Sequence, residues 1–296
     1  MSSADLRWAF DAVDRSGERA LSLRWSLRDR CAVSAVAFER GRRPVAASLS
    51  LPRDEAGFVG GGVHAGVGPC VLARDGARVA LGAGPQRLAC EVAFSGSGAG
   101  GDVAPSGLSR LLGAGIASPM VRLAVDGTAT VRGEVWPIAG WHGALTSRSA
   151  ALRPRALVSG SCSVWQDGLN AAFGGGTERL RVAGAPVDAR VLSLTVDGAR
   201  HAFGRVTGDV SMRRWRFEAP GQGASLRGEI WADTADFAGL REPFGPGDRL
   251  FSLVSLFAQA RIELTRPGHA PLVLRSTCAA LEIGTRDPNH GIEIIA

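Results

Sequence analysis

The residues with the clearest chemical potential lie in one short segment: Glu134, Trp136, Trp141 and His142. A histidine exchanges a proton near neutral pH, and a carboxyl group inside an apolar barrel has a raised pKa that suits acid catalysis. Two indole faces can hold a conjugated chain beside these groups. We therefore take His142 and Glu134 as candidate catalytic residues, and Trp136 and Trp141 as candidate substrate contacts. The alternatives are aromatic packing beside a surface histidine, and a glutamate on the outer face of a strand.

A second segment places a carboxyl and an amide next to an aromatic ring. Here Asp167 is a candidate catalytic residue, and Trp165 and Gln166 are candidate substrate contacts. The run Gln166-Asp167-Gly168 is also typical of a turn. His201 shares a strand face with Phe203 and is a further candidate for substrate binding.

Other catalytic or cofactor-binding motifs are either absent from the sequence or followed by residues that do not suit the motif's usual structure. The G-x-G-x-x-G match at 96–101 is followed by Pro105 and Gly107 where a helix should begin, which favours a flexible loop. The five cysteines include no C-x-x-C pair, and the five histidines have no zinc-binding spacing. No nucleophile elbow or phosphate-binding loop occurs. We expect reduced thiols, no metal and no cofactor.

Charge and hydropathy limit the partners. All 34 basic residues are arginine, and they alternate with acids along the whole chain instead of gathering into a patch. We therefore expect no nucleic-acid partner despite the net charge of +6. No run approaches the roughly 18 apolar residues of a membrane helix, and the first residues include acids and lack a secretory h-region. We expect a cytoplasmic protein with no membrane insertion.

The elements that must position these residues are strands. Glycine at 40 and proline at 15 interrupt the chain too often for long helices. Period-two alternation recurs, as in Leu88–Phe94, where every second residue is apolar. The dipeptides Asp126-Gly127 and Asp197-Gly198 predict type I′ hairpins, and a third hairpin is expected around 220–223. The chain reads as all-β.

The length of 296 residues is too great for one small barrel. Eight strands with their turns need roughly 130–180 residues, so two barrels are expected. Apolar alternation lapses over residues 146–154, between two strand-rich halves. We predict an N-terminal domain at 1–150 and a C-terminal domain at 151–296.

Several segments in a fixed order carry a family resemblance. They are NAAFGGGTERL (170–180), LSLTVDGARHAF (192–203), STCAALEIG (276–284), and, more loosely, residues 67–81, 123–141 and AGWHG (139–143). Together they resemble the tocopherol cyclase family and its tandem lipocalin-like relatives, which include carotenoid 1,2-hydratases and lipocalin-like Diels–Alderases. The chain departs from that pattern in lacking tyrosine and in having a single tryptophan over 158–167.

The resemblance implies two tandem lipocalin-like antiparallel β-barrels packed together. It also implies an enzyme, a cofactor-independent cyclase that closes a ring in a large apolar polyene, polyketide or prenylated substrate during natural-product biosynthesis. A hydratase of an isoprenoid double bond is the first alternative. A non-catalytic carrier of lipophilic molecules is the second. The expected partner is an apolar small molecule, and the expected state is a monomer or weak homodimer.

The residues expected to point into each barrel suggest where a substrate would fit. Those of the N-terminal half are small, such as Ala89 and Ala93, whereas those of the C-terminal half are bulky, such as Trp215 and Phe217. Small barrels fill their interiors unless inward residues are small. We therefore expect the site at the mouth of the N-terminal barrel, where it meets the second barrel.

Overall fold

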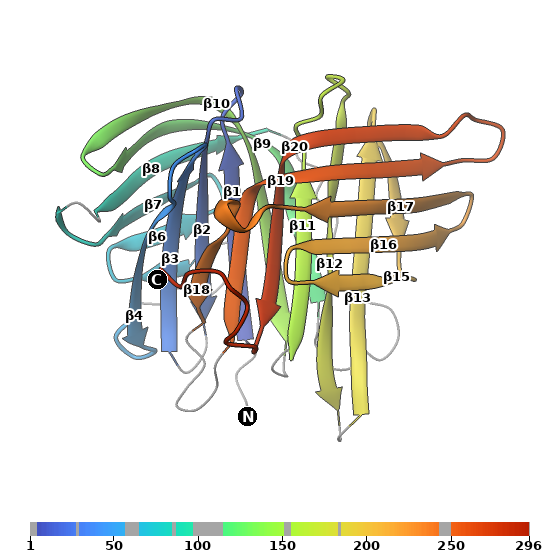
Figure 1. Ribbon diagram of the computed structural model, residues 1–296. Coiled ribbons are helices and arrows are strands. Elements are labelled where there is room, and N and C mark those ends of the chain that lie inside the picture. The colour runs from blue at the N-terminus through green and yellow to red at the C-terminus, as the bar shows by residue number, and fades with distance from the viewer. Residues whose placement is uncertain are drawn as a thin grey trace.

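The computed structural model describes residues 5–27, 30–56, 65–84, 87–96, 115–150, 155–182, 185–242 and 250–295. Nearly all regular structure in these residues is strand, arranged as two ten-stranded antiparallel sheets that lie side by side (Figure 1). This confirms the all-β fold class expected from the sequence. The first sheet uses strands up to Ala150 and the second begins at Ala156.

The first sheet curls into a barrel in the order β4-β3-β2-β1-β10-β9-β8-β7-β6-β5. Residues of its two end strands, β4 and β5, approach one another and nearly close it. Its strands are β1 Asp5–Val13, β2 Arg19–Leu27, β3 Arg30–Glu39, β4 Val45–Pro52, β5 Ala65–Val67, β6 Cys70–Ala73, β7 Gly76–Leu81, β8 Leu88–Ser95, β9 Gly115–Val131 and β10 Glu134–Ala150.

The second sheet has the order β14-β13-β12-β11-β20-β19-β17-β16-β15, and β18 pairs with β19 off this path. Its strands are β11 Ala156–Cys162, β12 Ala171–Val182, β13 Ala185–Val196, β14 Ala199–Phe203, β15 Thr207–Ser211, β16 Arg214–Gly221, β17 Ala224–Trp231, β18 Ala238–Arg241, β19 Phe251–Thr265 and β20 Leu272–Thr285. A short 3-10 turn, Thr234–Asp236, precedes β18.

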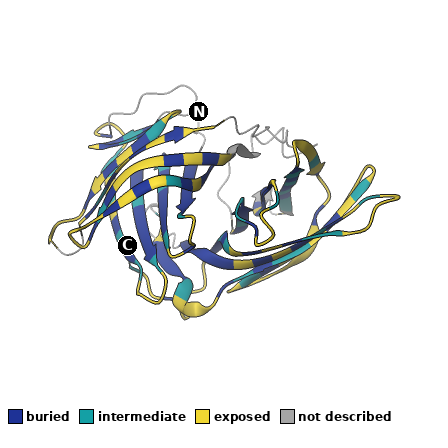
Figure 2. Cartoon of the chain, turned by 90° about the horizontal axis from the view of Figure 1, so that it is seen from above, coloured by how far each residue is buried: buried dark blue, intermediate teal, exposed yellow. Residues whose placement is uncertain are grey.

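Alternation along the strands builds one apolar core inside each barrel, as the buried positions in Figure 2 show. In β2, Leu21, Leu23 and Trp25 are buried in the first core, whereas Ser22 and Arg24 lie on the opposite face. Successive side chains of a strand point to opposite faces, so the sequence pattern decides which residues fill the barrel.

Two of the expected hairpins are confirmed. Asp197 and Gly198 both have positive φ, at 47° and 83°, and join β13 to β14. A type I′ turn needs positive φ at both positions. The turn at Gln222-Gly223 joins β16 to β17 where a hairpin was expected, with positive φ at Gly223 alone of the two residues, at 73°.

The hairpin expected at Asp126-Gly127 is wrong. These residues lie within β9, and the turn to β10 is made by Arg132 and Gly133, with φ of 53° and 82°. The Asp126 carboxylate instead accepts a hydrogen bond from the backbone N–H of Gly140, 2.7 Å away. It thereby stabilises a β-bulge in the neighbouring strand β10.

The barrels pack through the outer faces of β1–β3 and of β18–β20. An apolar cluster joins them, in which the rings of Phe38 and Phe257 meet edge to face with centroids 6.1 Å apart. Its buried members are Val13, Ala20, Val36, Phe38, Ala238, Leu240, Val254, Leu256 and Phe257. In Figure 1, β19 and β20 run along this boundary before bending into the second barrel.

Beside the apolar cluster lies a buried set of charges, which we call the inter-barrel ion cluster: Asp11, Arg24, Arg148 and Glu282. Arg24 donates to Asp11 at 2.9 Å within the first barrel. Arg148, also from the first barrel, reaches Glu282 of the second at 3.0 Å. Charges removed from water in this way must remain paired, so the cluster fixes how the two barrels dock.

No helix among the described residues has the length and apolar character needed to cross a membrane.

Candidate functional site

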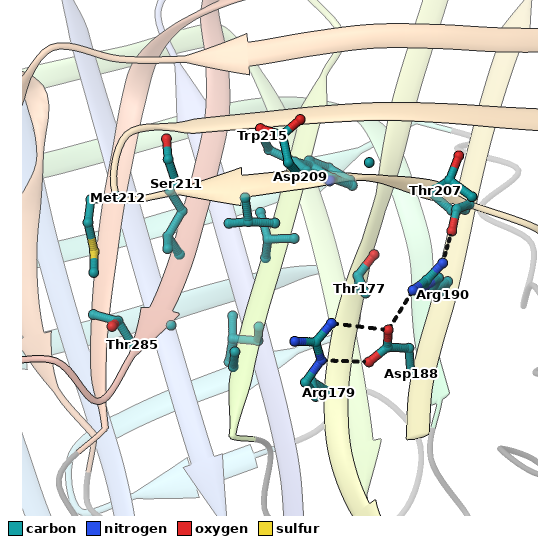
Figure 3. A pocket seen from close by; sticks show the side chains of 18 residues that line it. Thr177, Arg179, Asp188, Arg190, Thr207, Asp209, Ser211, Met212, Trp215 and Thr285 are labelled. Carbon is teal, nitrogen blue, oxygen red and sulfur yellow. Dashed lines mark hydrogen bonds and ion pairs between the residues drawn. The ribbon is translucent and has the colours of Figure 1, made fainter. Parts of the chain in front are cut away.

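A cavity of about 580 Å³ opens at one end of the second barrel (Figure 3). Ligand sites for drug-sized molecules typically have about 300–1,000 Å³. The lining residues are Ala156, Leu157, Val158, Thr177, Arg179, Asp188, Arg190, Val206, Thr207, Gly208, Asp209, Val210, Ser211, Met212, Trp215, Ile283, Gly284 and Thr285. All of them belong to the C-terminal half, between β11 and β20.

One side of this cavity is polar and is built by β12 and β13. Alternation along β13 puts Asp188 and Arg190 on the face that deeper in the barrel carries the buried Leu192. Arg179 donates to both carboxylate oxygens of Asp188, from Nε at 3.0 Å and from Nη2 at 3.4 Å. Arg190 donates to the same carboxylate from Nη2 at 2.5 Å. One carboxylate therefore orients two guanidinium groups (Figure 3).

The charge of this group is fixed near neutral pH. Burial alone would raise the pKa of Asp188, but the hydrogen bonds and charges of Arg179 and Arg190 outweigh it, so that the pKa lies below its ordinary value. Asp188 is therefore ionised, and the three side chains together carry one positive charge. Arg190 also donates from Nη1 to the carbonyl of Val206. These contacts use two of its five N–H donors, and a third of its side chain is exposed.

The buried part of the remaining lining is apolar. Val158 of β11 and Ile283 of β20 are almost fully buried and face Trp215 of β16 in the same core. Val210 of β15 pairs with Trp215 and shares its face, yet 48% of it is exposed. Every residue of this edge strand is exposed, so β15 forms the open side of the cavity.

The structure separates the four residues of the segment 134–142. Trp136 and Trp141 are buried in the core of the first barrel. His142 is exposed on the other face of β10, because adjacent residues of a strand point in opposite directions. Loss of hydration and the charges of Arg15 and Arg122 lower the pKa of His142 below its ordinary value.

Glu134 begins β10 with half of its side chain exposed, and it pairs with Arg19 at 2.6 Å. The first barrel thus does not bring Glu134, His142 and the two tryptophans to one described cavity. Their assignment to catalysis and binding stays a prediction. Residues 57–64 and 97–114 lie outside the described residues.

The segment 165–167 forms a turn. The N–H of Gly168 donates to the carbonyl of Trp165 at 3.0 Å, and Gln166 and Asp167 are exposed. Trp165 itself is buried in the second core and donates from Nε1 to the carbonyl of Ala171 at 2.8 Å. His201 is half-buried on β14, on the same face as the buried Phe203, and does not line the cavity.

Sequence reasoning missed Arg179, Asp188 and Arg190. A signal was present on β13, where Asp188 and Arg190 alternate in phase with the apolar Leu192, Leu194 and Val196. Among the described residues, no group of three or more His, Cys, Asp or Glu side chains could hold a metal ion.

Comparison with known proteins shows what fold this is. No protein-family model and no curated sequence matches the chain. Kievitone hydratase from Nectria haematococca superposes with a TM-score of 0.58 at 9% identity, over 95% of this chain and 89% of that chain. CghA in complex with Sch210972 superposes with a TM-score of 0.62 at 9% identity, over 96% of this chain and 88% of that chain. A second structure of CghA gives 0.60 at 10% identity, with the same coverage.

The chain has the tandem lipocalin-like fold. At such low identity the likeness extends to the arrangement of strands over nearly the whole chain, and it does not assign side-chain roles. The fold that the sequence motifs implied is confirmed.

Proposed function

We propose that this protein is a cofactor-independent cyclase, which binds an elongated apolar molecule with a carbonyl group in the cavity of the second barrel and closes a ring within it. The observation that carries the proposal is a cavity with two kinds of lining: the buried apolar side chains Val158, Trp215 and Ile283 of β11, β16 and β20, and, on β12 and β13, Arg179 and Arg190 held on Asp188. The solved complex of CghA with Sch210972 supports small-molecule binding by this fold.

An intramolecular cycloaddition suits this arrangement. The π electrons of a diene and of a carbonyl-activated alkene form two carbon–carbon bonds, with no proton, electron or leaving group to handle. The barrel folds the flexible chain so that the reacting carbons approach, which removes entropy from the barrier. An N–H of Arg190 directed at the carbonyl oxygen withdraws electrons from the alkene and stabilises charge that grows in the transition state. The Asp188 carboxylate keeps that guanidinium in place.

Hydration of a double bond is the second candidate, and the likeness to a protein named kievitone hydratase favours it. Hydration requires an acid that protonates the alkene. Asp188 cannot supply that proton readily, because its lowered pKa keeps it ionised. Asp209, the other carboxyl group of the lining, is exposed on the edge strand β15, where it is poorly placed to protonate an alkene held inside the cavity. The geometry therefore supports cyclisation better than hydration.

The test uses a linear trienone, in which a diene and an enone are joined by a short saturated chain. The purified protein should raise the rate of cyclisation over buffer and change the ratio of stereoisomers, measured by chiral chromatography. Replacing Arg190 by methionine should lower the rate at least about tenfold, or about 1.4 kcal/mol in the barrier. A rate and isomer ratio equal to those in buffer would refute the cyclase.

A matched control is Arg30→Met. Arg30 is exposed at the start of β3 in the first barrel, where it donates from Nε to the Ser50 hydroxyl at 3.0 Å, so the substitution removes the same charge from the other barrel. It should leave cyclisation unchanged. Tight binding of the trienone without any acceleration would instead identify a carrier of lipophilic molecules.

A further inference from the structure

We infer that Trp215 is the floor of the cavity and sets the length of the apolar chain that the site accepts. This rests on the proposed function, since it concerns the substrate of the same cavity. Trp215 lines the cavity and is itself 2% exposed, so its ring separates the open end of the barrel from the filled end.

The filled end consists of stacked aromatic rings. Trp215 meets Phe217 with centroids 4.8 Å apart and Phe173 at 6.3 Å. Phe173 and Phe217 stack face to face at 5.3 Å with an interplanar angle of 7°. Neither phenylalanine lines the cavity. Trp215 is thus the one member of this stack that a bound chain would touch.

Glycines on the neighbouring strands make room for these rings. A Cβ at Gly228 would lie 2.5 Å from Phe217, and a Cβ at Gly160 would lie 2.7 Å from Ile230 and 3.4 Å from Trp215. The rings therefore lie directly against the strands and block the barrel across its width. Space beyond Trp215 is already occupied, so a longer chain cannot be accepted by small side-chain movements.

The polar wall gives the chain a direction. Arg179 and Arg190 stand on β12 and β13, so a carbonyl bound there leaves the rest of the molecule to lie along the apolar wall toward Trp215. Each buried methylene adds about 0.8 kcal/mol of binding, which is about fourfold in affinity. Affinity should therefore rise with chain length until the terminal methyl meets the indole ring, and then stop rising.

The experiment measures the binding of a series of 2-alkanones of increasing length by calorimetry. For the native protein we expect a stepwise gain of about fourfold per methylene up to a limiting length. In Trp215→Leu the gain should continue to longer ketones. Trp231→Leu is the matched control, because Trp231 lies on the neighbouring strand β17 and does not line the cavity. Its limiting length should equal that of the native protein.

A second measurement does not depend on Trp215→Leu folding. A 2-alkanone of the limiting length with a terminal bromine should quench tryptophan fluorescence in the native protein, and much less in the conservative variant Trp215→Phe. The same limiting length in Trp215→Leu, or equal quenching in Trp215→Phe, overturns the inference while leaving the cyclase intact. If no 2-alkanone binds the native protein, the proposed function fails and the inference fails with it.

Discussion

The strongest local interaction at the candidate site is one carboxylate shared by two arginines. Asp188→Asn removes the charge that holds both guanidinium groups, leaving Arg179 and Arg190 to repel each other. We expect the cyclisation rate to fall about tenfold, while binding of a saturated 2-alkanone falls less, because the apolar wall is untouched. Steady-state kinetics and calorimetry on the same variant separate the two effects. Equal loss in both would mean that Asp188 only supports the fold.

A set of single substitutions decides between this cavity and the sequence-based site. Glu134→Gln, His142→Ala and Asp167→Asn change groups that lie on the first barrel or on an exposed turn. If the chemistry takes place in the second barrel, each variant should cyclise the trienone within about twofold of the native rate. A loss of at least about tenfold in any of them would return the site to the sequence-based residues.

The sequence shows which residue types can do chemistry, but it does not show which side chains surround them in the fold. Adjacent residues such as Trp141 and His142 look like a constellation, but a strand turns them to opposite faces. Arg179 and Asp188 face each other across the β12–β13 hairpin, so their own pairing is local. The strands that complete the cavity around them, β15, β16 and β20, lie farther along the chain, and only long-range pairing brings them there.

At the scale of elements, two glycines with positive φ distinguish the cost of a close backbone contact from the cost of the backbone angle alone. Gly127, within β9, has a φ of 147°, and a Cβ there would lie 2.1 Å from the Glu91 carbonyl oxygen. Gly127→Ala should therefore lower the free energy of unfolding by at least about 3 kcal/mol. Gly133→Ala, in the β9–β10 turn with φ 82° and nothing within 4 Å, should cost only about 1 kcal/mol. Urea unfolding compares the two. Equal losses would show that the backbone angle, and not the contact, dominates.

The two Asp-Gly dipeptides show which elements can be predicted from the sequence. Asp197-Gly198 follows a regular alternating run and makes its hairpin where expected. Asp126-Gly127 has the same signal but continues through β9, because its carboxylate is engaged by Gly140 at the bulge of β10. A turn signal is local, whereas the bulge that overrides it is formed by a neighbouring strand. Strand identity was therefore predictable, and strand ends were less so.

At the scale of the whole molecule, the inter-barrel ion cluster joins the two barrels beside the apolar cluster, and its members come from β1, β2, β10 and β20. Glu282 accepts from Ser252 at 2.7 Å and from Arg148 at 3.0 Å. Burial opposes ionisation of Glu282, but the charges of Arg148 and Arg24 prevail and lower its pKa from 4.5 to about 2. Asp11 behaves in the opposite way, since its burial outweighs the charge of Arg24 and raises its pKa.

These shifts predict how stability depends on pH. A carboxyl group whose pKa is lower in the folded state stabilises the fold above its unfolded pKa, and that contribution disappears as the pH falls through the folded pKa. Glu282 should therefore contribute about 3 kcal/mol at neutral pH, lost between about pH 5 and pH 2. Asp11 binds its proton more readily when folded, so it partly offsets this loss as the pH falls. The fold should still weaken in acid.

Glu282→Gln isolates the contribution of this one carboxylate, because it keeps the shape of the side chain and removes the charge. It leaves Arg148 buried without its closest carboxylate, and the free energy of unfolding at neutral pH should fall by about 3 kcal/mol. The variant should also lose most of the decline in acid, which urea titrations from pH 7 to pH 3 would measure. Glu134→Gln, a half-exposed partner of Arg19, is the control and should change stability by less than about 1 kcal/mol. Parallel pH curves for the native protein and Glu282→Gln would show that the acid sensitivity arises elsewhere, and that Glu282 does not couple the docking of the barrels to pH.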